Sequence, residues 1–124
     1  MDYPDVISQH VADNQLQIEL MINPELEAFA GHFDQFPIIP GVVQISWALH
    51  YFSSFLAGQP VTSSTRQVTT IKTLKFQHVI TPNSLVILDL SFDVSKQVLA
   101  FRFYNSEHQY SSGKILLTHA ESES

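Results

Sequence analysis

The chain contains no cysteine, and only four of its 124 residues are glycine. Without cysteine, a disulfide framework and thiolate chemistry are both excluded. No glycine-rich loop lies between a strand and a helix, so we do not expect a nucleotide-binding fold. Basic residues are also scarce, and the net charge of −6 argues against nucleic acid as the main partner.

A basic leader and a long membrane-spanning run are also absent from the sequence. The chain begins with the acidic residues Asp2 and Asp5, whereas a secretory leader begins basic and then turns apolar. We therefore expect a cytoplasmic protein with no membrane partner. The hydrophobic fraction of 44% is enough for a core. We expect a single domain over residues 1–124, with residues 1–4 and 120–124 frayed.

Most of the chain has the residue pattern of β-strands. Residues 16–22 begin with strict apolar–polar alternation and, with residues 6–11, predict an opening hairpin. Further strands are expected over residues 68–80, 85–94, 98–104 and 108–119. In the last of these, a bulge is expected near Ser112 and Gly113.

One long apolar helix interrupts the strands, over residues 41–57, and Gly58 is its stop signal. A helix that is apolar on most sides is expected to be buried. At about 100° per residue its polar side chains form one stripe, made of Ser46, His50, Ser53 and Ser54. Gln44 lies away from this stripe and is expected to anchor a neighbouring loop or a dimer. Runs of strands around one helix predict an α+β fold, an antiparallel sheet around the helix, with the stripe facing a pocket.

A histidine, His32, lies in a tight loop between Gly31 and Pro37, just before this helix. The ordinary histidine pKa of about 6.5 allows a neutral base at cytoplasmic pH. The helix amides at Gly41 and Val42 have no intrahelical partners and favour developing negative charge. A loop base aimed at a helix start is therefore a candidate site. The other histidines are scattered without metal-site spacing, so we expect no metal and no cofactor; they are His10, His78, His108 and His119.

The residues around His32 resemble a known family. Gly31-His32-Phe33, followed by residues 37–45, resembles the signature of bacterial 3-hydroxyacyl-acyl-carrier-protein dehydratases of the FabA/FabZ type. Residues 74–76 and 81–85 resemble that family's third strand and following turn. The variant at residues 36–41, with Trp47-Ala48, is most similar to the dehydratases of aryl polyene gene clusters. This resemblance implies a hot-dog fold, a dimer with acyl tunnels at the subunit interface, and an acyl carrier protein that delivers the substrate.

The resemblance also implies residue roles. The loop histidine of the family takes a proton from C2 of the 3-hydroxyacyl thioester, and a glycine amide binds the thioester carbonyl; these fall on His32 and Gly41. The family's acid, on the central helix of the other subunit, falls on Ser46. A serine hydroxyl is a poor proton donor at neutral pH, so the chain departs from the pattern here. His50, one turn later, is either a proton donor, a partner of Ser46 or a structural histidine.

The remaining expectations concern substrate contacts and partners. Phe33 and Phe36 are expected at the acyl entrance or in the core, and Val42 beside the substrate at the helix start. Three basic residues lie close together in the sequence of an otherwise acidic chain, Arg66, Lys72 and Lys75, and they either dock an acidic carrier protein or form a solvated strand edge.

Three functions stay open. The first is a dehydratase with an unusual helix residue, working as a homodimer. The second is an impaired subunit that pairs with an active hot-dog partner. The third, ranked lowest, is a thioesterase, for which Asp34 is the one carboxylate near the motif.

Overall fold

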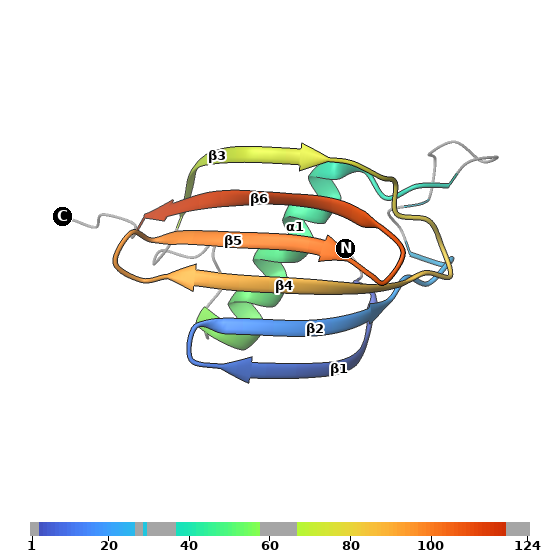
Figure 1. Cartoon of the computed structure of the whole chain (residues 1–124), viewed down its shortest axis with the longest axis horizontal. Helices are drawn as coiled ribbons and strands as arrows, with labels where there is room; N and C mark the ends of the chain where they lie inside the picture. Colours follow the sequence, from blue (N-terminus) through green and yellow to red (C-terminus); the bar gives the residue numbers. More distant parts are fainter. Residues whose placement is uncertain (1–2, 27–28, 30–36, 58–66, 119–124) are drawn as a thin grey trace.

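The computed structural model describes residues 3–26, 29, 37–57 and 67–118. Six strands form one antiparallel sheet in the order β1-β2-β4-β5-β6-β3 (Figure 1). Their bounds are β1 (Asp5–Ala12), β2 (Gln15–Met21), β3 (Gln67–Phe76), β4 (Leu85–Asp93), β5 (Val98–Tyr104) and β6 (Gln109–Thr118). The opening hairpin is therefore confirmed, and β1 and β3 are the two edges of the sheet.

One helix crosses a single face of this sheet. Helix α1 (Gly41–Tyr51) begins beside the end of β3 and runs toward the β1–β2 side (Figure 1). The expected helical extent of residues 41–57 is confirmed, but its last part, η2 (Phe52–Ala57), is π-helical rather than α-helical. The expected burial is only partial, because Val42 is 74% exposed.

The hydrophobic core lies between the helix and the sheet. Along β2, β4 and β5 every second residue is buried, which is the period of a strand with one covered face. The largest fully buried side chains come from both layers: Trp47, Phe52, Phe103, Leu16, Ile18, Leu20, Leu88, Leu90, Leu99 and Ile115. This packing fixes the position of the helix on the sheet.

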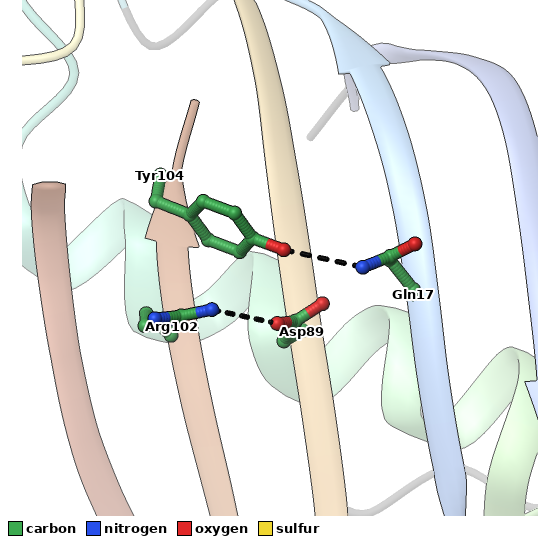
Figure 2. A network of polar contacts seen from close by, with 4 residues as sticks. All are labelled: Gln17, Asp89, Arg102 and Tyr104. Carbon is green, nitrogen blue, oxygen red and sulfur yellow. Dashed lines mark hydrogen bonds and ion pairs between the residues drawn. The ribbon is translucent and has the colours of Figure 1, made fainter. Parts of the chain in front are cut away.

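The opposite face of the sheet carries polar side chains. Figure 2 shows Gln17, Asp89, Arg102 and Tyr104 on β2, β4 and β5, on the side away from the helix. Arg102 forms an ion pair with Asp89 at 3.1 Å, and Gln17 Nε2 donates to the Tyr104 hydroxyl at 3.2 Å. Exposed pairs of this kind contribute little to stability.

Strand β3 is shorter than the sequence predicts. Residues 68–80 were expected to form one strand, but β3 ends at Phe76. The next two amides, of Gln77 and His78, both donate to the Tyr110 carbonyl, at 2.9 and 3.3 Å. Because two consecutive amides share one carbonyl, the regular ladder cannot continue, and residues 77–80 turn toward the helix start.

At Ser112 and Gly113, where a bulge is predicted in β6, the extra residue lies on the facing strand β3, and β6 itself has an irregularity at Tyr110, against β5. Lys72 pairs with Lys114 and Lys75 pairs with Ser112, so β3 advances three residues while β6 advances two. Thr73, which lies between these two pairs, has a positive φ of 50°. The extra residue therefore faces the part of β6 where the bulge was predicted, but it belongs to β3.

The start of the chain is held against the helix rather than frayed at Tyr3 and Pro4. The Tyr3 ring stacks on the His50 imidazole, with ring centroids 3.5 Å apart and planes 5° apart. The Tyr51 hydroxyl donates to the Pro4 carbonyl at 3.0 Å. Residues 120–124, also expected to fray, lie outside the described residues.

Candidate functional site

A cavity of about 330 Å³ opens at the start of α1. It is lined by Ile38, Ile39, Pro40, Gly41, Gln44, Phe76, Gln77, His78 and Val79. A Cβ on Gly41 would lie 2.5 Å from Cζ of Phe76, so a larger residue at this position would require the half-exposed Phe76 ring to move. The end of β3 and the backbone of the helix start therefore form one wall.

Buried hydrogen bonds fix the segment that leads into the helix. Gln44 is 3% exposed, and its Nε2 donates to the Ile39 carbonyl at 3.1 Å. Its Oε1 accepts a 2.6 Å hydrogen bond from the Ser111 hydroxyl on β6. The Ile39 amide donates to the Ile80 carbonyl at 2.9 Å. The prediction that Gln44 anchors a neighbouring loop is confirmed, and the helix start is tied to the sheet.

The first turn of the helix borders this cavity through Gly41 and Gln44. Val43 and Gln44 donate their amides to the Pro40 carbonyl, at 3.1 and 3.2 Å. The amides of Gly41 and Val42 precede them, in the turn where a helix has no internal acceptor to offer. Such amides stabilise negative charge on an oxygen bound beside them. Gly41 lines the cavity at the helix start, and its role as donor to a thioester carbonyl stays a prediction.

Several predicted site residues cannot be placed. His32, Phe33 and Phe36 lie outside the described residues. The same is true of Asp34, named for the thioesterase alternative, and of Arg66, one of the three basic residues. Within the described part of the chain, the site consists of the helix start and the side chains that surround it.

The polar stripe of the helix lies apart from the cavity at its start. Ser46, His50 and Ser53 are half-buried, and Ser54 is exposed. Neither Ser46 nor His50 is among the residues that line the cavity at Gly41. His50 contacts the flat face of Tyr3 and, at 4.9 Å between centroids, the edge of Tyr51. Burial lowers the pKa of His50 below its ordinary value of 6.5, which favours the neutral imidazole.

Two histidines that the sequence analysis treated as scattered lie together. The rings of His78 and His108 stack with centroids 3.8 Å apart and planes 10° apart. They line a second cavity, of about 610 Å³, together with Asn105 and Tyr110. No sequence signal predicts this pair, because it forms only when the end of β3 meets the β5–β6 turn. Within the described residues, no group of three or more His, Asp or Glu side chains is arranged for a metal ion.

Three lysines share the outer face of the sheet at the β3 edge. Lys72 and Lys75, which the sequence analysis singled out, are exposed on β3. The register of β3 against β6 places Lys114 directly opposite Lys72. Lys114 was missed because strand register cannot be read from the sequence over this distance. We call Lys72, Lys75 and Lys114 the lysine cluster.

Comparison with solved structures identifies the fold. A chain of the dehydratase heterocomplex ApeI:P from Xenorhabdus doucetiae matches with a TM-score of 0.83 and 32% identity, covering 94% of this chain and 99% of that chain. An uncharacterised protein from Erwinia carotovora subsp. atroseptica matches with a TM-score of 0.79 and 31% identity, covering 95% and 98%.

A more distant structure shares the fold alone. It is the dehydratase domain of PpsC from Mycobacterium tuberculosis, with 15% identity and a TM-score of 0.66, covering 96% of this chain and 44% of that chain. Together with the six-stranded antiparallel sheet and helix α1 across it, these matches define an α+β protein of the hot-dog fold, as found in dehydratases.

The family follows from the sequence itself. The model of the ApeI-like family, described as ApeI dehydratase, matches residues 8–114, and this chain therefore belongs to the ApeI-like dehydratases. A comparison with curated protein sequences gives no significant match. Among the described residues, no helix combines the length and the apolar character needed to cross a membrane.

Proposed function

We propose that this chain acts on 3-hydroxyacyl thioesters carried by an acyl carrier protein, removing water to give the trans-2-enoyl thioester. The observation that carries this proposal is the cavity at the start of α1, which Gly41 lines together with the apolar residues Ile38 and Phe76. An amide that can polarise a carbonyl, next to room for an acyl chain, suits a thioester. Membership of a dehydratase family supports the same chemistry.

The proposed reaction needs two proton movements. The Gly41 amide donates a hydrogen bond to the thioester carbonyl and so acidifies the C2 hydrogen. Neutral His32 takes that proton as general base, and the electron pair forms the C2–C3 double bond. The C3–O bond breaks, and the hydroxyl leaves as water once it receives a proton. Phe33 and Phe36 flank the acyl chain, and the reaction takes place in the cytoplasm without a cofactor.

Position 46 limits this scheme. The family's acid would protonate the leaving hydroxyl, but the chain has Ser46, whose hydroxyl is a weak acid. General acid catalysis contributes about 10²–10⁴-fold, which corresponds to about 3–5 kcal/mol of barrier. We therefore propose that a homodimer of this chain dehydrates its substrate slowly.

A second candidate follows from the same residue. The chain is a subunit that pairs with another hot-dog protein, and the partner's central helix supplies the missing acid while this chain supplies His32 or only a tunnel wall. The relative from Xenorhabdus doucetiae, itself part of the heterocomplex ApeI:P, supports this arrangement. The partly exposed apolar side of α1, including Val42, supports a second subunit in either case.

The test is turnover of a 3-hydroxyacyl carrier protein followed by mass spectrometry. Loss of water reports dehydration, and loss of the acyl group reports a thioesterase. We expect slow dehydration by the unaltered chain and a rate at least roughly tenfold higher with Ser46→Asp. His32→Ala should show no dehydration at all. Ser54→Asp, on the exposed side of the same helical segment, is the control and is expected to leave the rate unchanged.

Melting temperatures accompany these assays. Fast dehydration by the unaltered chain, or an inert but folded Ser46→Asp variant, would show that position 46 is not the vacant acid site. If His32→Ala loses activity only in proportion to lost folding, His32 is structural.

A further inference from the structure

The edge strand β3 has an uncovered apolar side. It is the last strand of the sheet, so its outer backbone groups have no neighbouring strand among the described residues. The register places Val68, Ile71 and Phe76 opposite buried or inward-facing residues of β6, on the helix side of the sheet. Yet Val68 is 40% exposed and Phe76 is 50% exposed. Because Phe76 also contacts Gly41, whatever covers this side borders the candidate site.

The other side of the same strand is positively charged. Lys72 and Lys75 face outward beside Lys114. They are three residues apart, and the extra residue of the bulge puts both on the same face of β3. The segment 67–76 contains no Asp or Glu, and the lysine cluster holds three of the six basic residues of a chain with net charge −6. In the described residues the one ion pair joins Arg102 and Asp89, so the lysine cluster has no carboxylate partner there.

This charge bears on self-association. In a two-fold dimer through this edge, β3 meets β3 of the second copy, and the same patch faces itself. Adjacent strands lie about 4.8 Å apart. The screening length is about 10 Å at 0.1 M salt. The lysines of the two copies would therefore repel one another, and like charges on facing strands destabilise the pairing.

Single edge strands are protected by edge lysines, by bulges or by charges that point inward. Strand β3 has the lysines and the bulge, but no charge on its inward side, which is apolar. The apolar side can be covered when a second subunit adds its edge strand beside β3. The outward lysines then favour an edge strand of opposite charge.

We propose that the lysine cluster selects, as the second subunit, a chain whose edge strand carries carboxylates, in preference to a second copy of this chain. This proposal shares one element with the proposed function, namely that a second subunit lies beside the site at Gly41. It assigns to Lys72 and Lys75 the choice of partner subunit rather than the docking of a carrier protein.

The test uses a charge-reversed copy of the chain as the acidic partner. Unaltered protein labelled with nitrogen-15 is mixed with unlabelled Lys72→Glu/Lys75→Glu, and native mass spectrometry counts the dimers. With no selection, half of the dimers would be mixed. If the mixed dimer binds roughly tenfold more tightly than each homodimer, it makes up about nine tenths of all dimers. Raising the salt from about 0.05 M to about 0.5 M should tighten the unaltered homodimer several-fold and weaken the mixed dimer.

Lys96→Glu is the matched control, since Lys96 is an exposed lysine in the β4–β5 turn, away from β3. Its mixture with the unaltered chain should give half mixed dimers. Half mixed dimers with the β3 variant, an equal excess with Lys96→Glu, or no dimers in any mixture would overturn the proposal. Melting curves establish that each variant is folded. No substrate is present, so this result does not depend on whether the chain is a dehydratase.

Discussion

The two ends of helix α1 are held to the rest of the molecule in different ways. Its start is fixed by buried hydrogen bonds, from Gln44 to the Ile39 carbonyl and from the Ser111 hydroxyl to Gln44. Its end is fixed by aromatic packing, in which Tyr3 covers His50 and Tyr51 lies edge-on to both rings, and by one hydrogen bond from the Tyr51 hydroxyl to the Pro4 carbonyl. The start borders a cavity, whereas the end is closed by the beginning of the chain.

This difference separates positioning from stability. Hydrogen bonds are directional, and those at the helix start fix where the Gly41 amide lies. Aromatic contacts contribute through buried area and tolerate several geometries. Changes at the start should therefore affect catalysis beyond their effect on folding, and changes at the end should affect folding alone.

The largest expected effect is at the start, with Gln44→Leu. Leucine fills a similar volume but leaves the buried Ser111 hydroxyl and the Ile39 carbonyl without this partner. Buried groups left unsatisfied cost about 1–3 kcal/mol each, and two are affected here, so the free energy of unfolding should fall by at least about 2 kcal/mol in urea titrations. Turnover per folded molecule should fall as well.

Gln44→Leu/Ser111→Ala tests the origin of that loss. Removing both partners of a buried hydrogen bond is less costly than removing one, so the double variant should regain part of the stability. A double variant that is no more stable than the single one would mean that the loss comes from packing instead.

At the other end, Tyr51→Phe should have a moderate effect. It removes the hydroxyl that donates to the Pro4 carbonyl and keeps the ring contacts. We expect a loss of about 1 kcal/mol in the free energy of unfolding, with unchanged turnover per folded molecule. The control is Tyr104→Phe, whose hydroxyl bonds Gln17 on the exposed face (Figure 2), and it should cost almost nothing. Equal losses in the two variants would contradict the contrast between a buried and an exposed hydroxyl.

The smallest expected effect is a pH dependence at the helix end. Burial holds the pKa of His50 below 6.5 in the folded state, so the unfolded chain binds this proton first as pH falls. The associated stabilisation is present above about pH 6.5 and is lost as pH falls through the lowered pKa. The melting temperature of the unaltered protein should therefore drop more between about pH 8 and about pH 5.5 than that of His50→Gln.

Tyr3→Ala sharpens this test, because it uncovers one face of the imidazole and should bring the pKa of His50 nearer to 6.5. Its pH dependence should lie between those of the unaltered protein and His50→Gln. If all three proteins follow the same curve, His50 does not contribute to the pH dependence of folding.

Local features of this structure could be predicted from the sequence. The alternation in residues 16–22 predicted a half-covered strand, and the apolar run at residues 41–57 predicted the one helix. The Pro40-Gly41 step predicted where the helix begins, and the isolated polar side chain of Gln44 predicted an anchor. Each of these signals lies within a few residues of the feature it predicts.

Features that depend on distant pairing could not be predicted. The early end of β3 depends on the Tyr110 carbonyl, which is more than thirty residues away along the chain. The same holds for the stack of His78 on His108 and for the position of Lys114 beside Lys72. The contact of Tyr3 with His50 joins the start of the chain to the end of a helix, and no period in the sequence reports it.

The bulge in β3 also has an evolutionary consequence. Residues three apart in a regular strand point to opposite faces, but the extra residue lets Lys72 and Lys75 share one. Deleting the codon for Thr73 would leave Lys72 and Lys75 two residues apart, so a regular strand would keep both on the outward face. Leu74 and Phe76 would stay on the helix side. One in-frame deletion would therefore remove the bulge while the charged face of this edge stays as it is, without altering any codon for a lysine.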